Sequence, residues 1–297
     1  MKLRPPSRDD AEGVLALLEA RDRADLGRPD LKLGDLLDAW SAADLDLAQD
    51  ATVCEAPEGT LVGYAVVRRL GTFGAVDPSR EGQGIGGALL DWVERRQRAL
   101  GWKEQRTAIV AGNERAEKLV AQRGYHLVRS YWRMAARLSG GPRYAEAPEG
   151  ISLRPLDPTG DAEALHALDA DAFADVAGTE PETLQAFTDE HLKAHDLDPF
   201  LSIVAERGDS PVGFLLARRW DEESVGYVDI LAVSPTEQGR GLGRALLLAA
   251  FNAIAATGLA DAELGVASDN AKALRLYESA GMQPRFQLGV YERPVAG

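Results

Sequence analysis

The sequence of 297 residues repeats itself once, and this duplication restricts the possible folds more than any other feature of the chain. The tripeptide Leu-Arg-Pro stands near the start of each half, at 3–5 and 153–155, and a Val-Gly-aromatic motif recurs at the same offset of 150 residues. A glycine-rich stretch then recurs at an offset of 157, at 82–87 and 239–244. The second copy therefore carries seven extra residues, around 220–226. Solenoid repeats have periods of about 20–50 residues, so a repeat of about 150 residues indicates two copies of one domain.

The segment between the copies has the composition of a linker. A Ser-Gly-Gly-Pro run at 139–142 is followed by a stretch that contains Pro148, and glycine and proline do not continue a strand. We therefore predict an N-terminal domain over residues 1–145 and a C-terminal domain over residues 146–297.

Each copy predicts the same order of elements, which is that of an α/β protein. A short strand leads into two helical stretches, β-rich runs follow, and the glycine-rich loop opens a long helix, at 84–100 and again at 241–256. A strand, a helix that starts at Asn113 or Asn270, and terminal strands complete the copy. The predicted fold class is α/β and layered, with a mixed central sheet flanked by helices in each copy.

The charge balance and the apolar runs exclude several classes of partner. The net charge is -14, which argues against nucleic acid, because binding there depends on Lys and Arg side chains that neutralise phosphates. An acidic surface is compatible with cationic substrates. The longest apolar run, 245–256, is shorter than the roughly 20 residues that span a bilayer, so we expect no membrane segment. One cysteine, Cys54, and no visible signal peptide predict a cytoplasmic location.

The glycine-rich loop of the second copy has the chemistry of a pyrophosphate cradle. It follows the β-rich run 227–233 and opens a helix. Glycines allow positive φ angles and let backbone N–H groups face an anion, and the helix N-terminus adds partial positive charge. The first copy also satisfies the dinucleotide pattern G-x-G-x-x-G at Gly82, Gly84 and Gly87, but Arg244 replaces the third glycine in the second copy. We therefore expect an anion site and not a dinucleotide oxidoreductase.

Two motifs of the second copy resemble those of the GNAT superfamily of N-acetyltransferases. Gln238, Gly241 and Gly243 match the family's loop Gln/Arg-x-x-Gly-x-Gly/Ala, and the run Asn270-x-x-Ala-x-x-Leu-Tyr277 matches its second motif. The resemblance covers nearly the whole chain, twice over. It implies two tandem GNAT folds, each with a splayed sheet whose opened strands receive the pantetheine arm, and it implies acetyl-CoA as the acyl donor.

Carried across residue by residue, the resemblance assigns a cofactor site to each copy. The backbone that would bond the arm and the thioester belongs to Leu231, Ala232 and Val233. Asn270 would contact the cofactor, and the pyrophosphate would bind to Gln238, Gly239, Arg240, Gly241, Leu242, Gly243 and Arg244. The corresponding positions of the first copy are Val76, Gly82, Gly84, Gly86, Gly87 and Asn113.

Tyr277 and Asp229 are the candidate catalytic residues. Tyr277 matches the family's tyrosine, whose hydroxyl commonly lies near the CoA sulfur, so the resemblance makes it the proton donor to the thiolate; the alternative is a packing role. Asp229 and Tyr227 lie two apart on one predicted strand and therefore share a face. Asp229 could take the proton of the amine directly or through water, or it could form a strand-edge salt bridge or contact the substrate. Glu278 is interpreted as a solvated helix residue.

His191 and His195 are four residues apart and could share one helical face. The segment between them lacks the glutamate of H-E-x-x-H, so we expect no metal site. His195 could instead line the acceptor cleft, because acceptor sites in the family often involve the early helices.

The first copy has lost the candidate catalytic groups. At the offset of 157, Thr72, Val120 and Glu81 replace Asp229, Tyr277 and Gln238. The loop glycines remain, which predicts that the phosphate cradle is kept. The carboxylate of Glu81 is expected to weaken CoA binding there.

These features predict an N-acetyltransferase that moves an acetyl group from acetyl-CoA to a primary amine of a small acceptor. The acidic surface favours a cationic acceptor, and the chemistry is assigned to the C-terminal domain. Two alternatives stay open, namely a non-catalytic protein that binds or senses acyl-CoA, and activity in the N-terminal domain. The tandem arrangement predicts a monomer or a homodimer.

Overall fold

The chain forms two compact units, which do not follow the order of the sequence. A computed structural model describes residues 1–29, 31–42, 44–68, 72–141, 143–144, 146–174 and 182–295. Unit 1 comprises Met1–Tyr131 together with Phe286–Gly297, and unit 2 comprises Trp132–Arg285.

Unit 1 packs helices against an antiparallel sheet. Its elements are β1 (Lys2–Arg4), η1 (Arg8–Asp10), α1 (Ala11–Leu26), α2 (Leu33–Ser41), α3 (Leu47–Asp50), β2 (Ala51–Glu55), β3 (Leu61–Val66), β4 (Phe73–Val76), η2 (Pro78–Arg80), α4 (Ile85–Ala99), β5 (Glu104–Val110) and α5 (Glu114–Gln122). The sheet has the order β1-β2-β3-β4. Its core includes Val14 of α1 and Trp40 of α2, and the indole N–H of Trp40 donates to the buried Tyr64 hydroxyl over 2.9 Å.

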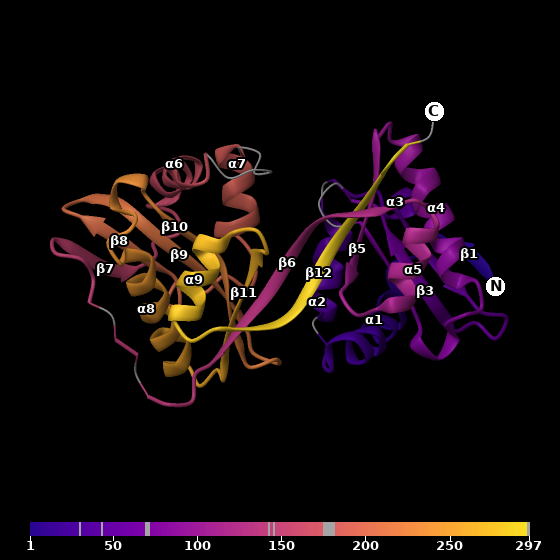
Figure 1. The fold of residues 1–297 in the computed structure, drawn as a ribbon, viewed down its shortest axis with the longest axis horizontal. Coiled ribbons are helices and arrows are strands. Elements are labelled where there is room, and N and C mark those ends of the chain that lie inside the picture. The colour runs from indigo at the N-terminus through magenta and orange to yellow at the C-terminus, as the bar shows by residue number, and fades with distance from the viewer. Residues whose placement is uncertain are drawn as a thin grey trace. The chain divides into compact units, whose positions relative to one another are not determined.

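Unit 2 is built on a mixed sheet. Its elements are β6 (His126–Arg137), which begins in unit 1, β7 (Ile151–Pro155), α6 (Ala162–Ala172), α7 (Leu184–Phe187), the π-helical turn η3 (Thr188–Leu192), β8 (Ile203–Arg207), β9 (Ser210–Trp220), β10 (Val225–Val233), η4 (Pro235–Glu237), α8 (Leu242–Ala256), β11 (Asp261–Ala267) and α9 (Ala271–Ser279). The strand order is β6-β11-β10-β9-β8-β7. β10 runs parallel to β11 and antiparallel to β9. Helices α6 and α7 cover one face of β8–β10, and α8 covers the other (Figure 1).

The terminal strands of the two copies are exchanged between the units. The last strand of the chain, β12 (Gln283–Pro294), pairs antiparallel with β5 of unit 1, from Leu288↔Val110 to Pro294↔Glu104. Conversely, β6 enters unit 2 at Trp132 and neighbours β11 there. The chain therefore passes between the units twice, in β6 and in β12 (Figure 1).

The units thus differ from the two stretches of sequence that the repeat delimits. The predicted domain boundary, between residues 145 and 146, falls in the linker. Pro142 and Ala145 of this linker lie outside the described residues, so the boundary stays a prediction. A strand can pair with any sheet edge that lies beside it. A sequence repeat does not show which copy of the domain provides that edge. The predicted fold class, α/β with mixed sheets flanked by helices, is confirmed by the element order and the strand pairing.

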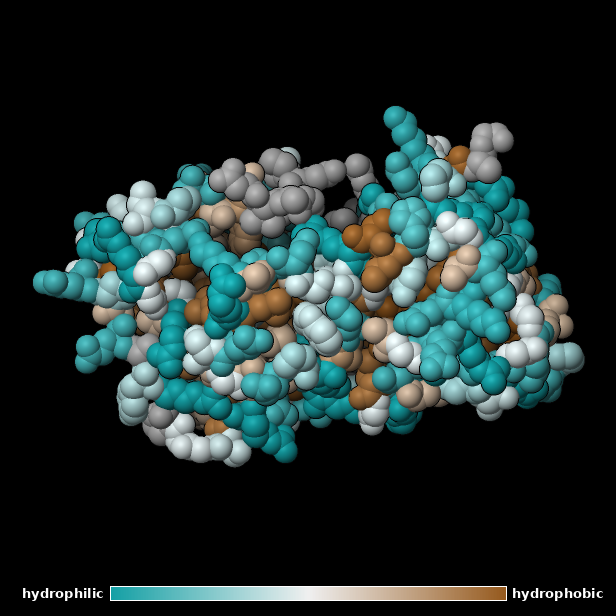
Figure 2. All heavy atoms as spheres, viewed as in Figure 1, coloured by the Kyte–Doolittle hydropathy of each residue, from teal (hydrophilic) through white to brown (hydrophobic). Residues whose placement is uncertain are grey.

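The long apolar run of the second copy forms α8, a core helix of unit 2. Leu246, Leu247 and Phe251 are at most 1% exposed. The helix lies so close to β10 that a Cβ on Gly226 would stand 2.5 Å from Ile254 Cδ1, so this strand position requires glycine. Among the described residues, no helix is long and apolar enough to cross a bilayer. Hydrophilic side chains cover most of the face drawn in Figure 2.

We predict that Tyr291→Pro destabilises unit 1 by about 2 kcal/mol or more, because proline removes a backbone donor and does not fit a paired strand. Tyr291 pairs with Thr107 in the middle of the β12–β5 contact, in phase with Gln287 and Val295, whose backbone groups bond Ala111 and Lys103. Hydrogen exchange of the full chain should lose protection along β5 while α8 keeps it. Tyr291→Thr, which loses the ring as proline does but retains the N–H, is the control. Equal loss of protection along β5 and α8 would contradict the assignment of this part of β12 to unit 1.

Candidate active site

The two parallel strands of unit 2 part from each other next to Asp229. β10 and β11 pair up to Val228↔Leu264, and within residues 182–295 this pairing goes no further although both strands continue. In the pairing of β10 with β9 the register shifts between Val228 and Ile230, so Asp229 occupies a bulge. Bulges bend a strand and redirect its side chains. The result is a V-shaped fork with Asp229 at its vertex, which matches the splayed sheet implied by the resemblance.

The glycine-rich loop lies at the end of β10, one arm of this fork, and turns into α8. Gly239 and Gly241 have φ angles of 76° and 89°, and Gly241 is the N-cap of α8. Both glycines serve the backbone conformation, since a Cβ on either would meet nothing within 4 Å. Gly243 instead provides space, because its Cβ would lie 3.2 Å from Leu276 Cδ2. The helix N-terminus offers N–H groups that suit a phosphate.

Gln238 closes the base of the loop. Its amide nitrogen donates to the Val233 carbonyl over 3.0 Å, and its oxygen accepts a hydrogen bond from Lys272 Nζ. The Val233 carbonyl therefore already has a donor within the chain. Ala232 and Leu242 are buried, so they can offer a ligand only backbone groups. The cofactor contacts assigned to the loop by resemblance stay predictions.

Tyr277 lies half-buried on α9, against the same core as Leu231 and Val233 of β10. Burial, and to a lesser degree the neighbouring Tyr227, raises the pKa of the Tyr277 hydroxyl to about 12. The phenol is therefore protonated at neutral pH and can donate a proton, which is the role that the resemblance implies.

The two motif asparagines act as helix caps. Asn270 Oδ1 accepts from Ala273 N over 3.0 Å, and Asn113 Oδ1 accepts from Ala116 N over 3.1 Å. Asn113 also donates to Asp25 Oδ2 over 3.1 Å. Capping accounts for an asparagine at both positions, and their contacts with a cofactor stay predictions.

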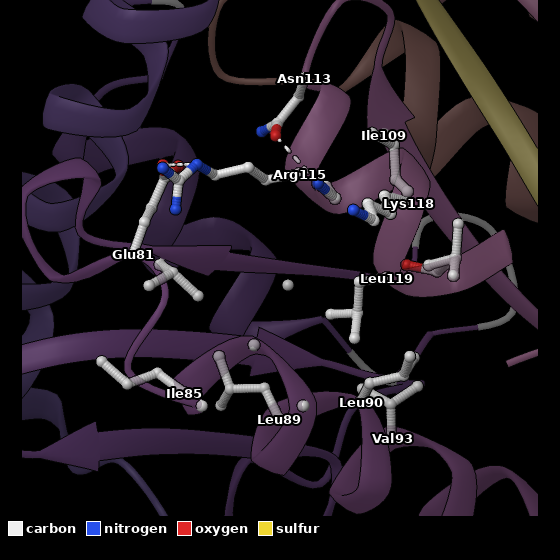
Figure 3. Close-up of a pocket in the computed structure, with 18 of the residues that line it drawn as sticks. Glu81, Ile85, Leu89, Leu90, Val93, Ile109, Asn113, Arg115, Lys118 and Leu119 are labelled. Atoms are coloured by element: carbon white, nitrogen blue, oxygen red, sulfur yellow. Dashed lines mark hydrogen bonds and ion pairs between the residues drawn. The ribbon is translucent and has the colours of Figure 1, made fainter. Parts of the chain in front are cut away.

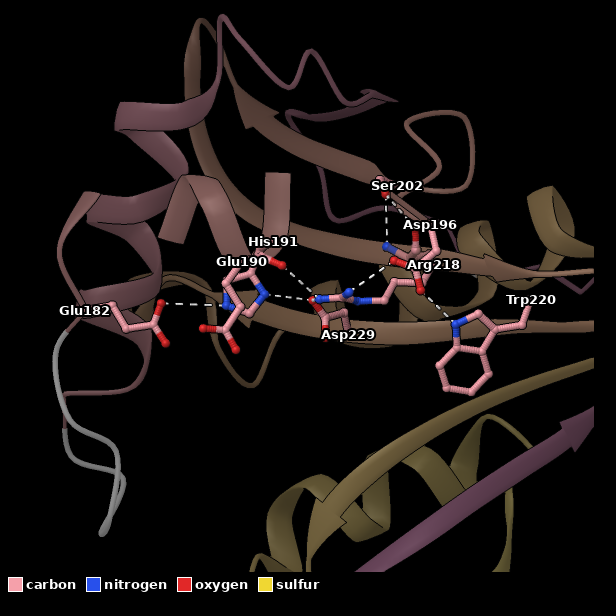
Figure 4. Close-up of polar contacts among 9 residues, drawn as sticks. Glu182, Glu190, His191, Asp196, Ser202, Arg218, Trp220 and Asp229 are labelled. Atoms are coloured by element: carbon pink, nitrogen blue, oxygen red, sulfur yellow. Dashed lines mark hydrogen bonds and ion pairs between the residues drawn. The ribbon is translucent and has the colours of Figure 1, made fainter. Parts of the chain in front are cut away.

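Asp229 holds a chain of polar contacts on the α7 side of the sheet (Figure 4). Its Oδ2 lies 2.8 Å from His191 Nδ1 and accepts a hydrogen bond from Arg218 Nη2 over 2.9 Å. Arg218 continues to Asp196 over 3.1 Å, and Asp196 accepts from the indole N–H of Trp220 over 2.9 Å. The charged side chains of this chain are each less than 20% exposed.

Charge pairing sets the protonation of this cluster. Burial opposes ionisation of Asp229, but the hydrogen bond from His191 and the charge of Arg218 outweigh it and lower the pKa of the carboxyl. Burial likewise opposes protonation of His191, yet the bond and charge of Asp229 outweigh it and raise the pKa of the imidazole above 6.5. An ionised carboxylate only accepts hydrogen bonds, so His191 Nδ1 carries the proton and the neutral ring keeps its lone pair on Nε2. Asp229, with a lowered pKa and two donors, is a weak proton acceptor.

The sequence analysis missed Arg218, Asp196 and Trp220. The insertion around 220–226, which lengthens the hairpin of β9 and β10, could have indicated Trp220, whereas Arg218 precedes it and matches Arg68 of the first copy at the offset of 150. Trp220, at the end of β9, stacks on Tyr227 of β10 with ring centroids 4.5 Å apart and planes 7° apart. The longer hairpin thus brings a second aromatic ring to the face that carries Asp229.

The two histidines that are four apart do not act as a pair. His191 contacts Asp229, whereas His195 is exposed, and its place in an acceptor cleft stays a prediction. Ligand atoms of Glu182, Glu190 and His191 lie within 4.8 Å of one another, but both glutamates are exposed, and exposed acidic groups often approach one another without a metal. The expectation of no metal also stays a prediction.

Unit 1 contains the equivalent fork, and there it encloses a cavity of about 380 Å³ (Figure 3). Among the described residues β4 and β5 share no ladder, and a backbone hydrogen bond runs from Ala108 N to Thr72 O over 3.0 Å. The loop glycines, apolar side chains such as Ile85, and Lys118 line the cavity. Thr72 and Val120, at the positions of the candidate base and acid, are both buried and offer neither group.

The carboxylate of Glu81 is paired with two arginines, and its expected weakening of CoA binding stays a prediction. Arg21 Nη1 donates to Glu81 Oε1 over 2.5 Å, and Arg115 Nε lies 3.3 Å from Oε2. At the offset of 157, Arg115 corresponds to Lys272, which bonds Gln238 in the second copy. Both loops are therefore closed by a side-chain pair at the same two positions, and the charge of Glu81 is offset by two arginines.

The His191–Asp229 pair predicts how stability depends on pH. The pKa of Asp229 is lowered, so its contribution is present above the unfolded carboxyl pKa and is lost as pH falls through the folded value. The pKa of His191 is raised, so its contribution is complete below 6.5 and is lost as pH rises through the folded value. His191→Asn should therefore lower the free energy of unfolding by about 1 kcal/mol more at about pH 5.5 than at about pH 9.

Chemical denaturation of wild type and His191→Asn at both pH values measures this difference. His126→Asn, at an exposed histidine of β6, is the matched control and should show no such change. A cost that does not vary with pH would contradict the charge pairing.

Known proteins match the chain over most of its length. The profile of the Acetyltransferase (GNAT) family matches residues 17–125 and 162–282. The mycothiol acetyltransferase of Thermobispora bispora is 34% identical over 284 residues, which cover 92% of this chain and 92% of that protein. The mycothiol acetyltransferase of Actinosynnema mirum is 35% identical over 240 residues, which cover 75% of this chain and 77% of that protein.

Solved structures share the fold. A GCN5-related N-acetyltransferase from Sphaerobacter thermophilus superposes with a TM-score of 0.84 at 29% identity, covering 100% of this chain and 96% of that one. A tandem GNAT protein from the clavulanic acid biosynthesis pathway superposes with a TM-score of 0.77 at 15% identity, covering 100% and 99%. At the latter identity the likeness concerns the fold alone.

Proposed function

Since the chain belongs to the acetyltransferase (GNAT) family, we propose that it transfers the acetyl group of acetyl-CoA to the primary amine of a small acceptor, with the chemistry in unit 2. The family and the named relatives make the chain an acetyltransferase enzyme with two GNAT-type regions. Members of this family generally use acetyl-CoA as the donor. The acceptor class and the active unit are the proposed parts.

One observation carries the assignment to unit 2: both copies keep the fork and the glycine-rich loop, but among the described residues only unit 2 has acid–base groups at the two aligned positions, the vertex of the fork and the motif tyrosine. Asp229 occupies its vertex with His191 attached, and the protonated phenol of Tyr277 packs beside the strand arm. In unit 1, buried Thr72 and Val120 take these places. Acyl transfer to an amine needs a proton acceptor and benefits from a proton donor at the leaving sulfur.

A small cationic acceptor fits the charges around the fork of unit 2. Glu182 and Glu190 flank His191, and the half-buried Asp169 lies close enough to sense its charge. An acidic entrance concentrates cationic amines. The relatives at 34% and 35% identity are named for mycothiol, which supports a small molecule over a protein as the acceptor. A cytoplasmic location, and a monomer or homodimer, are retained from the sequence as part of the proposal.

The cavity of unit 1 favours a second, compatible function, which is CoA binding without chemistry. It lies at the equivalent loop, where Gly84 has φ 84° and caps α4 as Gly241 caps α8. Arg115 and Lys118 add positive charge to its lining. This arrangement supports a bound nucleotide that stabilises unit 1.

The matched pair Gly243→Glu and Gly86→Glu distinguishes the two loops. Neither glycine has a positive φ, and a Cβ would lie 3.2 Å from Leu276 or Leu119, so each change places a carboxylate in its cradle at equal steric cost. We expect Gly243→Glu to abolish thiol release from acetyl-CoA in the presence of primary amines, and Gly86→Glu to retain it. Calorimetric titration with acetyl-CoA should show one equivalent lost in each variant.

The opposite pattern, with transfer lost in Gly86→Glu and kept in Gly243→Glu, would place the chemistry in unit 1. A wild type that binds acetyl-CoA but releases no thiol with any amine would favour the non-catalytic alternative. A single equivalent in wild type that persists in Gly86→Glu would reject CoA binding by unit 1.

We expect Tyr277→Phe to lower kcat about 100-fold or more, because the departing thiolate loses its proton donor, while the dissociation constant of acetyl-CoA stays nearly unchanged. Tyr291→Phe, at a tyrosine of β12 in unit 1, is the control and should keep the wild-type rate. Steady-state kinetics and calorimetry make the measurement. Wild-type kcat in Tyr277→Phe would reduce this tyrosine to a packing role.

A further inference from the structure

Resting on the proposed function, we propose that His191 is the general base of acetyl transfer and that Asp229 is its positioning residue. Asp229 at the vertex of the fork fixes the imidazole through Nδ1, and Nε2 accepts the proton of the attacking amine. Asp229, which the sequence suggested as a candidate proton acceptor, then holds the imidazole in place and does not take the proton.

The imidazole of His191 is held from two sides. Nδ1 lies 2.8 Å from Asp229 Oδ2, and the ring packs against Phe187 with centroids 5.3 Å apart. The side chain is 14% exposed, so the ring is mostly enclosed but not sealed from solvent. It stands on the π-helical turn η3, a rare geometry that is frequent at functional sites. A restrained ring with one nitrogen bound and one lone pair available is the form that general bases take.

The remaining nitrogen faces an acidic surrounding. Nε2 lies 3.7 Å from Glu182 Oε2, and Figure 4 shows the ring between Glu182 and Asp229. The charged groups that act on His191 from its own and the neighbouring elements are Asp229, Glu182, Glu190 and Asp169; Arg218 in turn bonds Asp229, and His166 acts on Asp169. Burial, with a smaller contribution from Glu182, raises the pKa of Asp169 to about 6, and the charge of His191 opposes this rise. A cationic amine is drawn toward this side of the ring.

Comparison of the two copies supports the assignment independently. At the offset of 150, the position of His191 in the first copy is Ser41, and at the offset of 157 the position of Asp229 is Thr72. Thr72 turns its hydroxyl to the backbone of Arg68, donating to its carbonyl over 2.8 Å. The first copy keeps the cradle but lacks base, positioning residue and acid together, as expected if the three form one catalytic set.

The proton and electron balance of the step is simple. The acceptor binds as the free amine after releasing one proton to solvent. As its nitrogen bonds the carbonyl carbon of the thioester, one N–H proton passes to His191 Nε2 and the C–S bond breaks. The sulfur leaves with the proton of the Tyr277 hydroxyl, and solvent then reprotonates Tyr277 and deprotonates His191. The products are the amide and free CoA.

Asp229 supports this step without exchanging the proton itself. Its Oδ2 receives Arg218 as well as His191, so it stays ionised and stabilises the imidazolium that forms. The same arrangement holds a histidine in the correct tautomer in other acyl-transfer enzymes. The competing interpretation is that the His191–Asp229 contact only ties η3 to β10.

The test compares wild type, His191→Asn and His126→Asn in the full chain, with acetyl-CoA and the amines putrescine, ethanolamine and D-glucosamine. Asparagine retains an N–H donor toward Asp229 but has no basic nitrogen. We expect His191→Asn to lower kcat/KM about 100- to 1000-fold and to abolish the acid limb of its pH profile, which in wild type rises through the pKa of His191. Acetyl-CoA affinity should change less than about twofold. Imidazole added to His191→Ala should restore part of the rate.

A His191→Asn variant with the wild-type rate and acid limb, or no rescue of His191→Ala by imidazole, overturns the proposal. Nitrogen NMR of histidine-labelled protein provides a readout that needs no acceptor. The signals of His191 are assigned as those missing from the spectrum of His191→Asn. At high pH they should show a proton on Nδ1 and a lone pair on Nε2. A proton on Nε2 overturns the assignment of the base, even if the proposed function holds. Absence of thiol release by wild type with every amine instead counts against the proposed function.

Discussion

The end of hydrogen bonding between β10 and β11 at Val228↔Leu264 is the constraint on which the site of unit 2 depends. A bulge at Asp229 bends β10, and the two strands diverge while both continue. The divergence separates the backbones of two arms of one sheet beyond this pair. It also turns one carboxylate toward β9 and η3, where Arg218 and His191 meet it. Geometry and electrostatics of the site thus have a common origin.

The duplicated copies separate what the backbone provides from what side chains provide. The capping glycines Gly84 and Gly241 have φ angles of 84° and 89°, and Gly86 and Gly243 each stand 3.2 Å, measured from an ideal Cβ, from a leucine of the following helix. The cradle is therefore preserved in near-identical form. The vertex and the motif helix have diverged, with the acid–base groups kept in unit 2 only among the described residues. This difference is the basis of our proposal that unit 1 binds CoA without chemistry.

The exchange of β6 and β12 ties each unit to the other half of the sequence. β5 obtains its antiparallel neighbour from the last strand of the chain, over Leu288 to Pro294. Pairing across such a sequence separation closes only after most of the chain has been ordered, so the formation of unit 1 depends on the C-terminal strand. A fragment that ends at the linker would leave β5 with an unpaired edge.

The sequence by itself determined the duplication, the α/β class, the position of the glycine-rich loops and the tyrosine of the motif helix. Each of these rests on local spacing, because glycine conformation, helix capping and hydrophobic periodicity act over a few residues. Only the tertiary structure decided the pairing of Glu81 with Arg21 and Arg115, the exchange of strands, and the attachment of His191 to Asp229. These contacts join residues far apart in sequence, and their partners follow from the packing of η3 and the longer β9–β10 hairpin over the fork. No local pattern encodes which buried charge will face which, so the histidine that the sequence offered as half of a pair became the partner of the aspartate.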